Sequence, residues 1–153
     1  MIDEEKPTDE MVTLRTWEEL SNEVQNRADL QRYPLTGMRP DDVREALKNT
    51  GSLNRDSWAN SWSNIGDRYR TLAEKQLEYD KKKASVNYLN AWRFYGFAAW
   101  PTQNTSLKKK AFETSLDNFR CYADLVSPSI ERVQLPFQEQ KVTRSKPANS
   151  MRD

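Results

Sequence analysis

The sequence of 153 residues contains no histidine, one cysteine and only four glycines. Histidine is the commonest general base and metal ligand in proteins, and it activates the nucleophile in serine and cysteine hydrolases. A single thiol, Cys121, cannot form a thiolate zinc site or an internal disulfide. The glycines are too scattered to form a loop that binds phosphate. We therefore expect no cofactor, no bound metal and no catalytic residue in this chain.

Long apolar runs and an excess of one charge are also missing. The 24 lysines and arginines are balanced by 23 aspartates and glutamates, which gives a formal net charge of +1. No overall positive field therefore favours nucleic acid or an anionic membrane. The longest apolar stretch, residues 94–100, is far shorter than the roughly 20 residues that span a bilayer. Because the N-terminus is acidic and unlike a signal peptide, we expect a soluble cytoplasmic protein.

What is present is a series of five segments with apolar residues at helical spacing, which predicts one all-α domain over residues 16–126. Thr16 and Glu19 have the spacing of a capping box, and Pro34 and Pro101 end two of the segments. The predicted helices form a bundle or hairpin array and cover about residues 16–33, 40–51, 54–83, 84–100 and 105–123. The lysine runs 81–83 and 108–110 are interpreted as solvated helix surface, and Cys121 as a packed thiol.

The flanking segments are predicted to differ from this domain. Residues 1–15 form an acidic, mobile arm, and residues 138–153 form a charged, disordered tail. Between the helices and the tail, residues 127–137 include the β-rich segment Ile130–Phe137, which predicts one trailing strand. A single strand lacks a partner for its backbone hydrogen bonds. We therefore interpret residues 127–137 as the start of a sheet that this chain does not complete.

The predicted helix over residues 84–100 is unusual because aromatic side chains surround most of it. A helix that is apolar on most sides requires burial on more than one side. Four of its residues are the candidates for a surface that contacts a partner or lines a pocket: Tyr88, Trp92, Tyr95 and Phe97. The alternative for each of them is an ordinary place in the core.

Two short motifs allow other interpretations. The spacing of Trp62, Gly66 and Tyr69 matches half of a tetratricopeptide repeat, but only one such unit occurs and solenoids need about three. We interpret it as a helical hairpin in which small and aromatic residues interlock. Asp41 and Asp42 resemble the aspartate-rich magnesium motif of isoprenoid synthases, but no second motif faces them. Acidic residues in a first helical turn ordinarily complement the helix dipole.

Several features follow one another in a particular order and spacing along the chain. They are Tyr33–Gly37, Asp41–Val43, Trp58 with Trp62, Ala84–Ala91, Tyr95 with Phe97, and Ile130–Phe137. Their order and spacing resemble the N-terminal helical region of a group of α/β-hydrolase-fold enzymes. The group includes 2,6-dihydropseudooxynicotine hydrolase and fungal polyketide-shortening hydrolases, and the resemblance covers roughly residues 20–137.

The resemblance implies a helical lid that covers the active-site mouth of a hydrolase core. The family's catalytic serine, acid and histidine lie downstream of this region, so none is carried onto this chain. We therefore expect a non-catalytic lid or interaction module of a truncated or split α/β-hydrolase of secondary metabolism. Its parent would hydrolyse an ester or an activated C–C bond with a serine nucleophile. The aromatic helix would contact the hydrolase core domain or a homo-oligomer partner. The alternatives are a free-standing helical adaptor that binds a partner protein and a magnesium-dependent enzyme.

Overall fold

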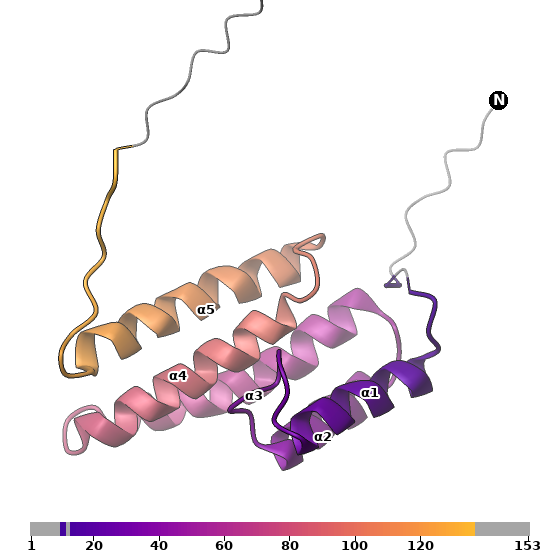
Figure 1. The fold of residues 1–153 in the computed structure, drawn as a ribbon, viewed down its shortest axis with the longest axis horizontal. Coiled ribbons are helices and arrows are strands. Elements are labelled where there is room, and N and C mark those ends of the chain that lie inside the picture. The colour runs from indigo at the N-terminus through magenta and orange to yellow at the C-terminus, as the bar shows by residue number, and fades with distance from the viewer. Residues whose placement is uncertain (1–9, 12, 137–153) are drawn as a thin grey trace, which may run out of the picture.

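The computed structural model describes residues 10, 11 and 13–136, and they form an all-α domain (Figure 1). Its helices are α1 (Trp17–Asp29), α2 (Pro40–Thr50), α3 (Arg55–Gln76), α4 (Lys81–Ala98) and α5 (Ser106–Leu125). Figure 1 shows α3, α4 and α5 as long antiparallel neighbours, with α1 and α2 packed beside one part of this layer. The predicted all-α fold of five helices is confirmed.

Four of the five described helices begin at a residue whose side chain accepts a hydrogen bond from a free backbone N–H, and α2 is the exception. At α1, Thr16 Oγ1 accepts from the N–H of Glu19 at 3.2 Å, and Glu19 Oε2 accepts from the N–H of Thr16 at 2.8 Å. This is the predicted capping box. Asn54 and Thr105 cap α3 and α5 through the same kind of bond. Pro40 is the first residue of α2, where its missing N–H costs nothing.

Two predicted boundaries are wrong. The lysines 81–83 do not end the third helix but form the first turn of α4, because Asp80 Oδ1 accepts from the N–H of Lys83 at 3.0 Å. The first helix ends at Asp29 rather than near Tyr33. Gln31 takes a left-handed conformation with φ of 52°, and a residue in that conformation does not continue a right-handed helix.

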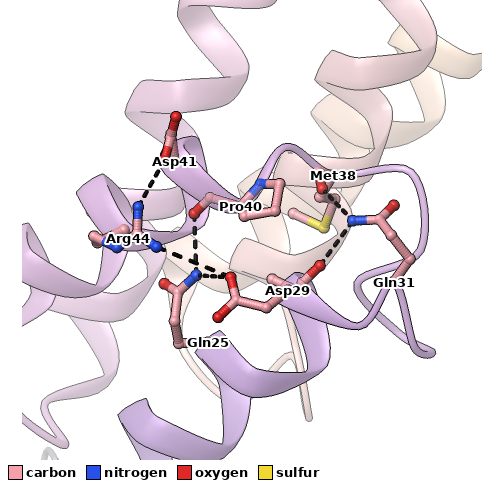
Figure 2. Close-up of polar contacts among 8 residues, drawn as sticks. Gln25, Asp29, Gln31, Met38, Pro40, Asp41 and Arg44 are labelled. Atoms are coloured by element: carbon pink, nitrogen blue, oxygen red, sulfur yellow. Dashed lines mark hydrogen bonds and ion pairs between the residues drawn. The ribbon is translucent and has the colours of Figure 1, made fainter.

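The loop between α1 and α2 is held by side-chain hydrogen bonds. Figure 2 shows Gln31 Nε2 donating to the carbonyl of Met38 at 3.0 Å, and the same group donates to Ala28 at 2.7 Å. Nearby, Gln25 Nε2 donates to Asp29 Oδ1 at 2.8 Å and to the carbonyl of Pro40 at 3.2 Å. These bonds hold the loop in one conformation beside α4.

The hydrophobic core lies mainly between α3 and α4. Trp58 and Trp62 are 0% exposed, Phe94 is 1% exposed, and their rings pack against one another. The indole N–H of Trp58 donates to the carbonyl of Phe97 at 2.9 Å, which links the start of α3 to the end of α4. Gly66 allows close approach, since a Cβ there would lie 3.0 Å from the ring of Tyr95. The predicted hairpin of interlocking small and aromatic residues is thus observed.

The predicted trailing strand is not formed. Residues 129–136 have no regular secondary structure, and no strand occurs in the part of the chain that the structure describes. Ile130 bonds through its N–H to the carbonyl of Ala123 at 3.1 Å, whereas Val133 and Leu135 are exposed. A strand requires a neighbouring strand for its hydrogen bonds, and none is available here. Phe137, the predicted tail at 138–153 and most of the predicted arm (1–9 and 12) lie outside the described residues.

Candidate functional site

The half of α4 that follows Trp92 borders an open groove of about 460 Å³. Its other walls are α5 and the loop between α1 and α2, which the bonds of Gln31 hold in place. The lining side chains are mostly aromatic or aliphatic, and we call this site the aromatic groove. It is lined by Tyr33, Pro34, Thr36, Trp92, Arg93, Gly96, Phe97, Trp100, Phe112, Ser115 and Leu116.

A second hollow of about 210 Å³ extends the aromatic groove toward α1. It shares Tyr33, Pro34, Phe97 and Trp100 with the first hollow and adds the apolar side chains of Leu20, Val24 and Leu35. The two hollows therefore form one surface that runs from α1, past the end of α4, to the middle of α5. A further hollow begins at Leu116 and continues along α5 to Ile130.

Large apolar side chains of the aromatic groove are open to solvent although the domain has a closed core elsewhere. Trp100 is 39% exposed, Phe112 37% and Leu116 38%, and Tyr33 is more exposed than any of these. A single exposed apolar side chain is ordinary, but several around one hollow mark an interaction surface. These residues come from three separate elements, so the fold itself assembles the surface.

The backbone leaves free space in the floor of the aromatic groove. Gly96 lies on α4 between Trp92 and Trp100, and a Cβ added there would meet nothing within 4 Å. Close packing therefore does not require a glycine at this position, in contrast to Gly66. The groove has room for side chains of another molecule at this point.

Arg93 joins the groove wall to the loop. Its guanidinium lies against Gly37, where a Cβ would come within 2.6 Å of Arg93 Cζ. Gly37 also has φ of +83°, which other residues rarely adopt. Arg93 Nη1 donates to Asn90 Oδ1 at 3.1 Å, so its polar partners are neutral groups. Arg93 takes part in none of the ion pairs among the described residues.

The four predicted contact residues occupy different environments. Trp92 and Phe97 line the aromatic groove, with the ring of Trp92 5.3 Å from that of Phe119. Phe97 is nevertheless mostly buried, and its ring meets Trp62 edge-on at 4.5 Å. Tyr88 lies in a separate small cluster with Ala73 and Ala84.

Tyr95, the fourth residue, faces α3 and not the aromatic groove. It is buried, and its hydroxyl donates a hydrogen bond to Asp67. Burial and this carboxylate raise the pKa of Tyr95 above its ordinary value. The structure thus brings Trp92 and Phe97 together at one site and leaves Tyr88 and Tyr95 in the packed interior. The contact role of all four remains a prediction.

Most of the exposed lining residues carry no signal in the sequence. Phe112 and Leu116 lie at helical spacing in the last predicted segment, and that spacing gives no sign that α4 leaves them uncovered. Tyr33 lies at the predicted end of the first helix. The available signal was Trp100, which lies outside the main face of an already aromatic helix.

The structure places Asp41 and Asp42 in separate ion pairs and does not bring them together at one site. Asp41 is exposed and pairs with Arg44 at 2.6 Å, as Figure 2 shows. Asp42 points between α2 and α3, where Arg68 Nη2 lies 2.6 Å from Asp42 Oδ1 and the hydroxyl of Tyr69 donates to Asp42 Oδ2. Burial, followed by this bond, raises the pKa of Tyr69 to about 12. In the described part of the chain, no three acidic, cysteine or histidine side chains come together to hold a metal.

Two further side chains differ from their predicted environments. Lys108, which belongs to a run interpreted as solvated, is 0% exposed, and its Nζ donates to the carbonyl of Trp100 at 3.1 Å. Burial and the nearby charge of Arg55 lower the pKa of Lys108. Cys121, which the sequence predicts to be a packed thiol, is exposed.

The lining of the aromatic groove is mainly apolar and aromatic. The described residues that line its first hollow include no carboxylate, cysteine or histidine, and Glu23 of the connected hollow is paired with Arg27. No protein-family model, curated protein or solved structure matches this chain. None of the described helices is both long enough and apolar enough to span a membrane. The groove is therefore the main observation that bears on function.

Proposed function

We propose that this chain is a non-catalytic helical interaction module that binds a partner protein through the aromatic groove. The observation that supports this proposal is the cluster of half-exposed large side chains around an open hollow, formed by Trp100, Phe112 and Leu116. Aromatic side chains are the commonest energetic anchors of protein interfaces. The walls are already fixed by core packing and loop hydrogen bonds, so binding would require little ordering of this chain.

The mode of binding follows from the shape of the site. The walls of the aromatic groove are helices and a loop, and the described residues offer no sheet edge for an added strand. Proteins with such grooves commonly bind the apolar face of an amphipathic helix, whose anchors recur at i, i+3 or i+4, and i+7. The free space above Gly96 would receive one of these anchors.

The proposal is tested with a neutral synthetic peptide of about 14 residues, roughly four helical turns. It carries leucines at the anchor positions and glutamine elsewhere. Because Trp100 is 39% exposed, its burial by the bound peptide should shift the tryptophan emission to shorter wavelength. Titration of the full chain should give saturable binding, and the absence of binding contradicts the proposal.

A pair of matched variants locates the binding. Leu116→Ser removes a 38% exposed anchor of the groove, whereas Leu72→Ser removes a 42% exposed leucine on α3 that lines none of the groove hollows. We expect the groove variant to weaken peptide binding about tenfold or more, as for loss of a modest hot spot, and the control to leave it unchanged. Equal effects of the two substitutions would show that the peptide binds apolar surface without selectivity.

A narrower proposal is that the partner is the core domain of an α/β-hydrolase, so that the chain acts as a lid. Its support is the resemblance carried by residues 20–137, and the comparisons add nothing to it. Sequencing the native transcript beyond the codon for Asp153 tests this version. An in-frame Gly-x-Ser-x-Gly elbow followed by an acid and a histidine would support it. Without them, the chain is a free-standing adaptor.

A further inference from the structure

Among the charged residues around the aromatic groove, basic residues outnumber acidic ones. Within the two connected hollows the charged lining residues are Arg15, Glu23, Arg27 and Arg93. Glu23 is already neutralised by Arg27, whose Nε lies 2.6 Å from Glu23 Oε1. The ion pairs among the residues that the structure describes include neither Arg15 nor Arg93. Among the described residues, the groove between α1 and the end of α4 therefore presents two unpaired positive charges beside apolar side chains.

The positive charge belongs to this part of the surface and not to the whole chain. The hollow farther along α5 is lined by two basic and two acidic residues, Arg120, Asp124, Glu131 and Arg132, and Arg120 also pairs with Asp117 at 2.8 Å. The formal net charge of the chain is only +1. A partner that responds to charge would therefore do so at Arg15 and Arg93.

We propose that the partner segment is an amphipathic helix with acidic side chains on both sides of its apolar stripe. This inference rests on the proposed binding function of the aromatic groove. The apolar stripe would pack on Trp100 and over Gly96, while its flanking carboxylates would face Arg15 and Arg93. Complementary charges at the rim of an interface mainly govern the rate of association, its salt dependence and the exclusion of wrongly charged partners.

The test compares three peptides that share the leucine stripe described above and carry glutamate, glutamine or lysine at the flanking positions. Affinity is measured from tryptophan emission of the full chain at low ionic strength. We expect the glutamate peptide to bind about tenfold more tightly than the lysine peptide, from a few exposed charge pairs of modest energy. The difference should shrink severalfold at ~1 M salt, where the screening length falls to about 3 Å.

Variants assign the preference to the two arginines. The double variant Arg15→Gln and Arg93→Gln should bind all three peptides alike, whereas Arg15→Lys and Arg93→Lys should keep the preference for glutamate. The lysine variant controls for the packing of Arg93 on Gly37, since it also loses the guanidinium. Lys75→Gln with Lys81→Gln removes the same charge beside the α3–α4 connection, at the other end of α4 (Figure 1), and should leave the preference intact.

The outcomes separate the two proposals. If none of the peptides binds, the proposed binding function fails. If all three bind with equal affinity, that function stands and the acidic partner is wrong. The acidic partner is also wrong if the distant lysine control abolishes the preference as completely as the arginine variant does. Sedimentation that shows self-association of the free chain, reversed by the neutral peptide, would make a second copy the occupant and overturn the inference.

Discussion

The two sides of α4 carry similar aromatic residues but have different surroundings. Toward α3, Phe94 and Tyr95 are nearly or fully buried against Trp62 and Gly66. On the side of the aromatic groove, Trp92 is half-buried and Trp100 is 39% exposed. The difference is one of coverage: α3 covers the first side completely, whereas α5 and the α1–α2 loop leave a gap on the second. The aromatic composition of a helix thus indicates that its sides are to be buried. It does not indicate whether this chain or another molecule covers them.

This contrast assigns the two sides different roles. The side toward α3 stabilises the fold, since each large ring there is surrounded by other core atoms and its loss leaves a cavity. The groove side contributes less to stability, because its rings already contact solvent in the free chain. Substitutions on the two sides should therefore separate stability from binding.

The largest effect is expected from truncating the two tryptophans that represent these sides. Trp62→Ala should lower the free energy of unfolding by about 3–5 kcal/mol, because a fully buried indole is replaced by a cavity. Trp92→Ala should cost about 1–2 kcal/mol, since its half-buried ring loses fewer contacts. Urea denaturation followed by circular dichroism measures both values. Equal losses would break the distinction between the two sides.

A smaller change in the free energy of unfolding, on the order of 2 kcal/mol, is expected when the pH is raised through the pKa of a buried tyrosine in the core. The pKa of Tyr69 is raised from 10.0 to about 12 by burial and by the bond to Asp42. The unfolded chain therefore loses this proton first as pH rises. The stabilisation is fully present below pH 10 and disappears as pH rises through about 12.

The variant Tyr69→Phe isolates this contribution. The difference in unfolding free energy between the native chain and the variant should be largest below pH 10 and should decrease between pH 10 and pH 12. Denaturation at several pH values measures it. Tyr95, whose pKa is also raised, remains in both proteins and gives them a common background. A difference that is independent of pH would contradict the assigned role of Tyr69.

The smallest effects on stability are expected when alanine replaces each of two glycines on neighbouring helices. The two effects should have opposite signs. Gly66→Ala places a Cβ 3.0 Å from the ring of Tyr95, which is buried and hydrogen-bonded and therefore cannot move away easily. We expect a loss of about 1 kcal/mol from overpacking. Gly96→Ala meets nothing within 4 Å and should gain about 0.5–1 kcal/mol of helix propensity. Thermal unfolding of both variants measures the sign, and a stabilising Gly66→Ala would contradict the close packing.

Much of the fold was predictable because helix boundaries depend on local chemistry. Helix starts can be predicted from residue type, because capping depends on a suitable side chain and proline has a fixed backbone geometry. Examples are the caps at Thr16 and Thr105 and the proline at position 40. The missed boundaries depended on less visible features. Asp80 is difficult to recognise as a cap because lysines follow it in the sequence. Pro34 limits how far α1 can extend, but it does not show where α1 ends.

The site was less predictable, because it consists of residues from three elements that meet only in the folded chain. Trp92 and Phe97 were found from the aromatic excess of one helix. Phe112 and Leu116 were indistinguishable from core positions, since helical spacing does not show how closely the neighbouring helix approaches. The strand predicted over 130–137 was wrong because alternation indicates a strand only where a partner strand exists.

The most direct measurement uses Gly96→Gln and determines both the unfolding free energy and the affinity for the glutamate peptide. Glutamine is a better helix former than glycine, and its Cβ meets no atom within 4 Å. We predict that the variant is slightly more stable than the native chain and binds the peptide at least about tenfold more weakly, because its side chain occupies the groove. Unchanged affinity in a stably folded variant would contradict the claim that the groove side of α4 is the binding surface.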